Sequence, residues 1–178
     1  RHLPDEPVGT MVEIDAKLAF GTGTHETTKM VARQLIETNP KGKRVLDCGC
    51  GTGILGIIAL KLGAESVVGY DIDEWSADNA RHNAVINGVG DYYDARLGDA
   101  GILDASLSFD IILANINRNI LIADMPIWQP LLNKGGRLIV SGFYSSDVDA
   151  LIAKASTLGL ALESRHNDGE WECLCFHF

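Results

Sequence analysis

Basic residues are scarce in this sequence relative to acidic ones. Its 178 residues include 15 Lys and Arg against 24 Asp and Glu, which gives a formal net charge of -9 at pH 7. Tight binding to a phosphate backbone depends on clustered Lys and Arg, so the composition argues against direct nucleic-acid binding. A basic protein partner would suit an acidic chain better, although acidity also serves solubility alone.

Long apolar runs are also missing. No stretch reaches the length of about eighteen apolar residues that a membrane-spanning helix needs. Residues 1–5, Arg-His-Leu-Pro-Asp, resemble neither a signal peptide nor a membrane anchor. We therefore expect a soluble, cytoplasmic protein that does not associate with membranes. Because the chain does not begin with Met, we also expect that a segment precedes Arg1 in the natural protein.

The cysteines lack the spacing of a metal site. They form two pairs, Cys48/Cys50 and Cys173/Cys175, with one residue between the partners, whereas zinc-binding pairs are usually separated by two to four residues. Alternate residues of a strand point to the same face of a sheet, so each pair is expected to line a buried sheet as small apolar side chains. We predict no metal site and expect reduced thiols.

What the sequence does contain is an alternation of short apolar runs with helical segments, in a chain of single-domain size. The apolar runs are typical of buried strands of a parallel sheet and lie at 44–46, 66–70, 109–114 and 137–140, with a further strand expected just before Leu97. Helices are expected at 54–62, at 73–87 with Asp73 as its cap, at about 118–132 and at 146–158. This alternation indicates a doubly wound α/β domain with helices on both faces of the sheet.

The two ends of the chain depart from this alternation. Near the start, Thr24 can cap a helix that continues to about Glu37, in which apolar residues recur four apart. Near the end, 160–165 and 170–178 are strand-like runs joined by 166–169, whose Asp-Gly pair favours a hairpin. We therefore predict a seven-stranded, mostly parallel sheet with a C-terminal antiparallel hairpin strand.

A glycine-rich loop follows the first strand. The segment 47–53, Asp-Cys-Gly-Cys-Gly-Thr-Gly, places Gly49, Gly51 and Gly53 directly before a helix. Alternating glycines let a ligand approach the backbone, and the helix N-terminus offers unpaired amides. Asp71 ends the second strand, 20 residues past Gly51, where its carboxylate can accept hydrogen bonds from both hydroxyls of an adenosine ribose. The loop and Asp71 together predict an adenosine-containing cofactor.

Two cofactors are compatible with this loop. Residues 51–56 match the dinucleotide pattern G-x-G-x-x-G, which keeps NAD open. S-adenosylmethionine is favoured by Asp47, because its carboxylate suits the methionine ammonium and would repel a pyrophosphate. Asp99 after the third strand also favours it, since a carboxylate there can accept from the adenine amine, although a surface-turn acid explains Asp99 equally well. The terminal hairpin is a third argument, because a dehydrogenase sheet of six parallel strands has none.

Two further blocks are specific enough to indicate a family. Residues 19–28, AFGTGTHETT, are similar to the pattern AFGTGTHxTT, and Ala114-Asn115-Ile116 is similar to ANIL, although Asn117 stands in the place of the leucine. On these blocks the sequence resembles the PrmA family, class I S-adenosylmethionine-dependent methyltransferases that methylate amino groups of the large-subunit ribosomal protein eleven. The resemblance covers essentially residues 10–178 and implies a Rossmann-like class I methyltransferase fold.

The resemblance also implies site residues. Thr28 would offer its hydroxyl to the methionine carboxylate, and Phe20 with Thr22 would lie in a loop that closes over the methyl donor. Asn115 would contact the cofactor beside its methyl group and is the predicted catalytic residue, holding an amine hydrogen and aiming the lone pair. With the residues argued above, the full predicted cofactor set is Thr28, Gly49, Gly51, Gly53, Asp71, Asn115, Asp99, Phe20 and Thr22.

The predicted function is transfer of methyl groups from S-adenosylmethionine to lysine side chains, or the N-terminal amine, of a large-subunit ribosomal protein, by direct in-line displacement. A related enzyme acting on another protein lysine or a small amine would share most of these motifs, and an NAD-binding domain is the distant alternative. We expect residues 1–24 to form a lead-in and cofactor-covering loop and 25–178 the catalytic domain. The family's N-terminal substrate-recognition domain is not among these residues, so the fragment is expected to bind cofactor yet methylate poorly.

Overall fold

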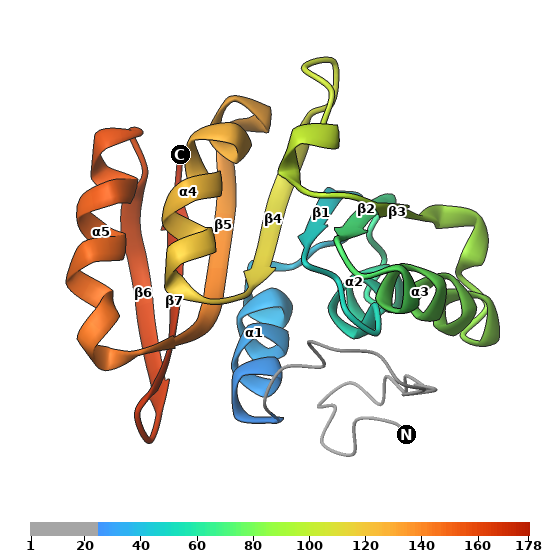
Figure 1. The fold of residues 1–178 in the computed structure, drawn as a ribbon, viewed down its shortest axis with the longest axis horizontal. Coiled ribbons are helices and arrows are strands. Elements are labelled where there is room, and N and C mark those ends of the chain that lie inside the picture. Colours follow the sequence, from blue (N-terminus) through green and yellow to red (C-terminus); the bar gives the residue numbers. More distant parts are fainter. Residues whose placement is uncertain (1–24) are drawn as a thin grey trace.

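A computed structural model describes residues 25–178, in which strands and helices alternate as the sequence predicts (Figure 1). The strands are β1 (Arg44–Cys48), β2 (Ser66–Asp71), β3 (Tyr93–Leu97), β4 (Phe109–Asn115), β5 (Leu132–Tyr144), β6 (Ala161–Asp168) and β7 (Trp171–His177). The α-helices are α1 (His25–Thr38), α2 (Ile54–Lys61), α3 (Glu74–Ile86), α4 (Arg118–Trp128) and α5 (Val148–Thr157). The predicted cap at Thr24 lies outside the described residues.

The strands of the described part form one sheet in the order β3-β2-β1-β4-β5-β7-β6. Neighbours are parallel except at β7, which runs antiparallel to both β5 and β6. The predicted mostly parallel sheet with one antiparallel hairpin strand is therefore confirmed. The strand order reverses at β1 and β4, and ligands of such open sheets bind in the crevice outside the carboxyl ends of the strands at this switch point.

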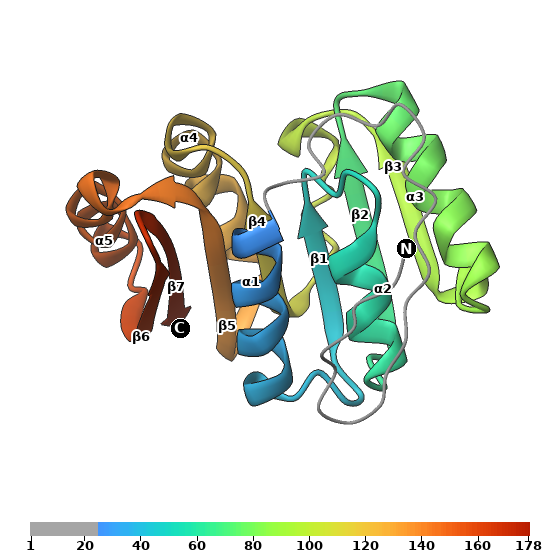
Figure 2. The same ribbon diagram turned by 90° about the horizontal axis from the view of Figure 1, so that it is seen from below.

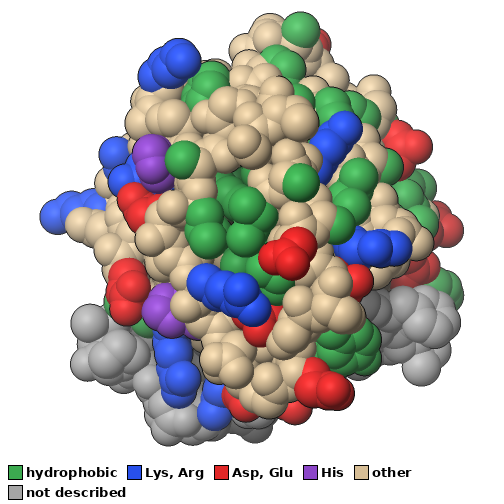
Figure 3. All heavy atoms as spheres, turned by 90° about the vertical axis from the view of Figure 1, so that its left-hand side faces the viewer, with side chains coloured by type: hydrophobic (Ala, Val, Ile, Leu, Met, Phe, Trp, Pro, Cys, Tyr) green, Lys and Arg blue, Asp and Glu red, His purple; other side chains and the backbone are tan. Residues whose placement is uncertain are grey.

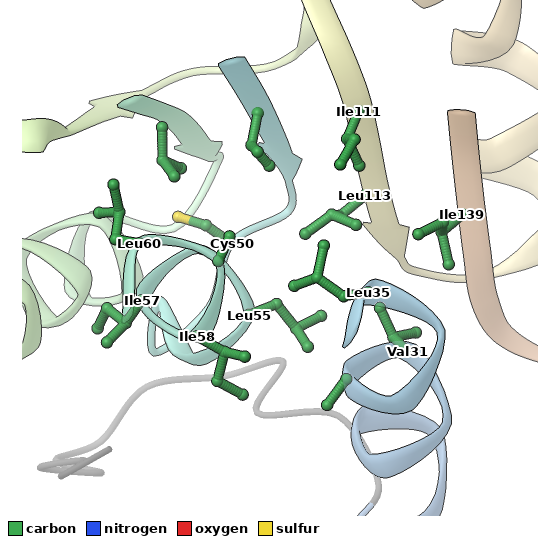
Figure 4. Packing of buried hydrophobic residues seen from close by; sticks show 14 of the residues in the cluster. Val31, Leu35, Cys50, Leu55, Ile57, Ile58, Leu60, Ile111, Leu113 and Ile139 are labelled. Atoms are coloured by element: carbon green, nitrogen blue, oxygen red, sulfur yellow. The ribbon is translucent and has the colours of Figure 1, made fainter. Parts of the chain in front are cut away.

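Helices cover both faces of this sheet (Figure 2). Ile111 and Leu113 of β4 belong to the buried cluster under α1, α2 and α3, whereas Ile112 and Ala114 belong to the cluster under α4 and α5. Figure 4 shows Leu35 of α1 pointing towards Leu113. The core thus fixes α1 on the sheet beside the switch point. Among residues 25–178, no helix has both the length and the apolar character needed to cross a membrane.

The outer edge of the sheet is strand β6, which is largely exposed. Figure 3 shows this edge with α5, where charged side chains surround a small apolar area. Leu162 is 39% exposed there, and charged residues such as Glu163 and Arg165 follow it along the strand. Charges on an edge strand oppose pairing with strands of other chains.

The predicted limits of three segments are wrong. The helix predicted to continue to residue 132 ends at Trp128, because Pro130 has no amide for the helical ladder and Leu132 pairs with Phe109 in the sheet. The strand predicted at 137–140 therefore extends over Leu132–Tyr144. The terminal hairpin is confirmed, but its link is not 166–169: β6 continues to Asp168, which pairs with Trp171. Gly169 takes the left-handed conformation (φ 60) that the turn needs, so the turn begins there and not at residue 166.

Two local side-chain predictions are also wrong. Cys48 and Cys50 lie in different core clusters, on opposite faces of the sheet, because β1 ends at Cys48 and Gly49 turns the chain with φ 62. Cys173 and Cys175 share one face as predicted, and all four thiols are buried and free. Asp73 occupies the cap position of α3, but its side chain accepts from the Ser76 hydroxyl at 2.9 Å and caps no backbone amide.

Candidate functional site

The glycine loop lies at the carboxyl end of β1 and leads into α2. Gly49, Gly51 and Gly53 all have positive φ, at 62°, 54° and 83°, a region that other residues rarely adopt. Close approach adds a second requirement at Gly49, where a Cβ would lie 2.6 Å from Cγ2 of Ile116. The loop therefore depends on its glycines for its path and for contact with the end of β4.

Hydrogen bonds tie this loop to β2 and α3. The amide of Cys50 donates to the carbonyl of Tyr70 at 2.9 Å, and the amide of Gly51 donates to Oδ2 of Asp71 at 3.0 Å. Oδ1 of Asp71 accepts from the amide of Asp73 at 2.9 Å, and Asn83 donates to the carbonyl of Thr52 at 2.8 Å. Asp71 thus holds the loop, and each of its oxygens keeps a further lone pair for a ligand.

Asp47 lies beneath the loop and is 3% exposed. Its Oδ2 accepts from the Tyr93 hydroxyl at 3.0 Å and from the amide of Gly56 at 3.2 Å. Burial raises the pKa of Asp47 to about 7, although these two hydrogen bonds lower it and nearby Asp71 raises it further. A carboxyl group with such a pKa is partly ionised at neutral pH and would be favoured in its charged form by a cationic ligand.

A small pocket beside the loop brings together residues that are far apart in the sequence. Its lining includes Thr28 of α1, Asp47, Gly49 and Asn115 at the end of β4. Thr28 is 6% exposed. The amide of Ile116 donates to the carbonyl of Ser141 in β5 at 3.0 Å, which fixes the end of β4 next to Asn115. The predicted residues Thr28, Gly49 and Asn115 therefore lie together as expected.

The outer part of the site lies at the ends of β2 and β3. The amide of Gly98 donates to the carbonyl of Asp71 at 2.8 Å, which joins these two strand ends. Asp99 follows and is exposed, with its Oδ1 accepting from the amide of Gly101 at 2.8 Å. Ile72, next to Asp71, is 74% exposed. An apolar side chain so exposed beside the candidate ribose site offers a surface for a planar ring.

Some predictions fall outside the described residues. Phe20 and Thr22 of the predicted covering loop are among them. Within residues 25–178, no group of three or more His, Cys, Asp or Glu is placed to hold a metal ion.

A second cavity, of about 420 Å³, lies at the opposite end of the central strands, near the amino ends of β1 and β4. It is lined by residues at the end of α1, by Asp110 near the start of β4 and by 134–137 of β5. Its charged residues are of both signs, including Lys43 and Glu37. It shares no residue with the pocket beside the glycine loop. Ligands of such sheets bind at the carboxyl ends of the strands, which is where the glycine loop lies and this cavity does not.

Two residues of the site were not predicted from the sequence. Tyr93 bonds to Asp47 across 46 positions of sequence, and no local pattern reports such a contact. Its signal is indirect and consists of Gly56 and Gly69, which leave room for the ring. Ile72 follows the recognised Asp71 directly, and its position just past the strand end was the only available sign.

Comparison with known proteins identifies relatives of the whole sequence. A family model described as ribosomal protein L11 methyltransferase (PrmA) matches residues 1–178. The ribosomal protein L11 methyltransferase of Porphyromonas gingivalis is 45% identical over 175 residues, which are 98% of this chain and 60% of the relative. That of Phocaeicola vulgatus is 41% identical over 163 residues, covering 92% of this chain and 58% of the relative. The chain thus spans about 60% of the length of the curated relatives that it matches.

Solved structures agree with the fold. A ribosomal protein L11 methylase from Lactobacillus delbrueckii subsp. bulgaricus superposes with a TM-score of 0.78 at 31% identity, covering 86% of this chain and 79% of that chain. An RNA methyltransferase from Salinibacter ruber in complex with S-adenosyl-L-homocysteine gives a TM-score of 0.68 at 21% identity, covering 83% of this chain and 88% of that chain. The second likeness bears on the fold alone.

Proposed function

The chain belongs to the ribosomal protein L11 methyltransferase (PrmA) family, and we propose that it binds S-adenosylmethionine at the glycine loop and transfers methyl groups to amino groups of a ribosomal protein. One feature of the structure supports this proposal independently of family membership. Asp71, Gly49 and Asn115 lie at the carboxyl ends of the neighbouring strands β2, β1 and β4. An adenosine site, a backbone cradle and a polar group beside the reacting atoms are therefore arranged in one line across the switch point.

The methionine end of the cofactor fits the inner part of the site. Asp47 has a buried carboxylate oxygen, Oδ1, that accepts no hydrogen bond from the described residues. A buried acceptor without a donor is costly, so this atom suits the ammonium group of the ligand. Thr28 would offer its hydroxyl to the carboxylate, while Gly49, Gly51 and Gly53 offer bare backbone.

The adenosine end fits the outer part. The free lone pairs of Asp71 would accept from the two ribose hydroxyls, and exposed Ile72 would lie against one face of the adenine. We assign the adenine amine to Asp99, which already accepts from Gly101 but keeps a second oxygen free of any hydrogen bond within residues 25–178. Phe20 and Thr22 remain predicted covering residues.

S-adenosylmethionine supplies a methyl group on a sulfonium, ready for in-line displacement. The protein must deliver a neutral amine, and for a lysine of pKa about 10.4 deprotonation at pH 7 costs about 4.6 kcal/mol. The side-chain carbonyl of Asn115 would accept an amine hydrogen and aim the lone pair. No nucleophile of the protein is required for direct displacement, and the Cys50 thiol in this pocket is a poor one, because burial raises its pKa well above its ordinary value.

The substrate assignment follows the family and the charge. A formal net charge of -9 suits a basic ribosomal protein, and such a substrate would place the reaction in the cytoplasm. The test is to incubate the chain with S-adenosylmethionine labelled in its methyl group and with proteins of the large ribosomal subunit. Because these residues are expected to methylate poorly without the family's recognition domain, we expect weak label, confined to lysine or N-terminal amines of one basic protein. Label on small amines alone, or on RNA, would contradict the assignment.

Asn115→Ala tests the catalytic residue in the same assay. We expect kcat to fall about a hundredfold, because loss of alignment at the reacting atoms has effects of this order. The control is Asn119→Ala, which removes an exposed asparagine at the second position of α4 and should leave turnover within about twofold. Unchanged turnover of Asn115→Ala would remove Asn115 from the mechanism.

A further inference from the structure

We propose that Tyr93 is a positioning residue for cofactor binding: its hydroxyl holds one oxygen of Asp47 so that the other faces the ammonium group of the ligand. The inference rests on the proposed function, since it assumes a ligand with the amino-acid end of methionine. Tyr93 lies on β3, outside the glycine loop, and does not line the pocket beside it. Its role would therefore be exerted through Asp47.

The hydrogen bonds of Asp47 are divided unequally between its oxygens. Oδ2 accepts from both Tyr93 and Gly56, at 3.0 and 3.2 Å, while no donor of the described residues reaches Oδ1. Asp47 is 3% exposed and lines the same pocket as Asn115. With Oδ2 occupied on the side of β3 and α2, Oδ1 is the atom left for a ligand, and a protein interior retains such an unpaired acceptor only at a cost.

Two glycines make room for the tyrosine ring. A Cβ at Gly56 of α2 would lie 2.5 Å from Cε2 of Tyr93, and a Cβ at Gly69 of β2 would lie 2.6 Å from its Oη. Both distances are far below van der Waals contact. Because β2 stands between β3 and β1 in the sheet, the ring can reach Asp47 only across these two side-chain-free positions. A side chain at either glycine would therefore displace the ring and break its contact with Asp47.

The groups around Asp47 favour the binding of a cation beside its carboxylate. Among residues 25–178, the groups that act on its charge are the hydroxyl of Tyr93 on β3, the carboxylate of Asp71 on β2, the thiol of Cys50 in the loop and the amide of Gly56 on α2. None of them is positively charged. Burial raises the pKa of Asp47 to about 7, and the hydrogen bond from Tyr93 is the largest cause that lowers it. The hydrogen bond from Tyr93 therefore favours the ionised form of Asp47, against the effect of burial.

Tyr93→Phe keeps the ring and removes this hydrogen bond. The pKa of Asp47 should rise, since a lowering cause is lost, and a shift of one unit corresponds to the strength of a typical buried hydrogen bond. If only ionised Asp47 binds the ammonium, affinity rises with pH through that pKa. The dissociation constant for S-adenosylmethionine should then be about eightfold higher than for the unchanged chain at pH 6.5 and less than about twofold higher at pH 8.5. The ratio at each pH cancels titration of the ligand itself.

Two controls separate this role from general loss of structure. Tyr70→Phe removes the hydroxyl of another buried tyrosine, which accepts from Trp128 at 2.8 Å on the opposite face of the sheet, and should leave the pH profile unchanged. Methylthioadenosine lacks the amino-acid end of the cofactor, so Tyr93→Phe should bind it as the unchanged chain does. Retained binding of methylthioadenosine also shows that the variant is folded.

The outcomes distinguish the inference from the proposed function. A pH-dependent loss confined to Tyr93→Phe and to S-adenosylmethionine supports the role of Tyr93. If the unchanged chain binds S-adenosylmethionine but Tyr93→Phe has the same affinity at every pH, the inference fails and the proposed function stands. An equal loss at pH 6.5 and 8.5, or an equal loss for methylthioadenosine, would show a structural role only and also overturns it. If the unchanged chain binds neither ligand, the proposed function itself fails.

Discussion

At the scale of single residues, Asp71 combines two tasks in one carboxylate. It holds the glycine loop through Gly51 and the start of α3 through Asp73, and we assign its remaining lone pairs to the ribose hydroxyls. This sharing links the shape of the loop to the presence of the ligand. A ligand that binds Asp71 therefore also stabilises the path of the loop around it.

Asp71→Asn should weaken the binding of S-adenosylmethionine strongly. The amide replaces one acceptor oxygen by a donor and removes the charge, and hydrogen bonds to charged groups contribute about 1.5–3 kcal/mol, so the dissociation constant should rise about 10- to 100-fold. Isothermal titration calorimetry measures it. Asp94→Asn is the control, because Asp94 lies on β3 in an exposed ion pair with Arg96. Equal affinities of the Asp71→Asn and Asp94→Asn variants would refute the ribose assignment.

The site residues that could be predicted from the sequence are marked by patterns of neighbouring residues. Gly49, Gly51 and Gly53 precede a helix, and Asp71 follows at a fixed distance. Asp47 was recognised as a carboxylate beside the loop, but its burial and its bond to Tyr93 depend on how β1, β2 and β3 pack. Contacts across separate strands have no sequence period, so they required the structure.

At the scale of elements, the end of β4 is held between two glycines. Ile116 lies against Gly49 on one side, and on the other a Cβ at Gly142 of β5 would come within 2.8–3.0 Å of backbone atoms of Ile116. Gly142 also has a φ of 97°. The backbone that carries Asn115 is thus placed by close approach to both the loop and β5.

Gly142→Ala should therefore lower kcat at least tenfold, because the new methyl group displaces Ile116 and with it Asn115, and misplacement by about 1 Å has effects of that order or more. Gly135→Ala is a matched control on the same strand, since Gly135 has a φ of 80° with no atom within 4 Å of its Cβ position. Both variants have the cost of left-handed backbone. Steady-state kinetics with equal loss in the two would mean that strain alone is responsible.

The terminal hairpin contains a buried acid. Glu172 is 3% exposed and accepts from Arg165 at 2.9 Å and from the Ser145 hydroxyl at 2.6 Å. Burial raises its pKa, but these hydrogen bonds and the charge of Arg165 more than offset this, so the pKa lies below the ordinary value of 4.5. A lowered folded-state pKa means stability that is present above about pH 4.5 and is lost as pH falls through the folded pKa.

Arg165→Met should lower the free energy of unfolding at pH 7, because the buried carboxylate of Glu172 then loses its cationic partner. At pH 3 the difference should be smaller than at pH 7, because the contribution of the ion pair is lost as pH falls below 4.5 and through the lowered folded-state pKa of Glu172. Urea unfolding at the two pH values measures this. Arg96→Met, which breaks an exposed pair, should change stability by less than about 0.5 kcal/mol. An undiminished loss at pH 3 would show that packing, not the ion pair, is involved.

At the scale of the whole molecule, the order of elements was predictable and their limits were not. Apolar runs and glycine positions indicated the doubly wound sheet and the hairpin strand, because both arise from short-range patterns. The longer β5 and the earlier end of α4 arise from the pairing of Leu132 with Phe109, which is a tertiary contact. The opposite faces of Cys48 and Cys50 follow from a strand end that periodicity does not locate.

The central claim is that the switch point between β1 and β4 binds S-adenosylmethionine, and thermal unfolding tests it most directly. At a hundred times its dissociation constant a ligand stabilises the folded state by about 2.7 kcal/mol, which for a chain of this size raises the midpoint by about 5–11 °C. We expect such a rise with S-adenosylmethionine and with S-adenosylhomocysteine and none with NAD. A rise with NAD alone would contradict the account and assign the glycine loop to a dinucleotide.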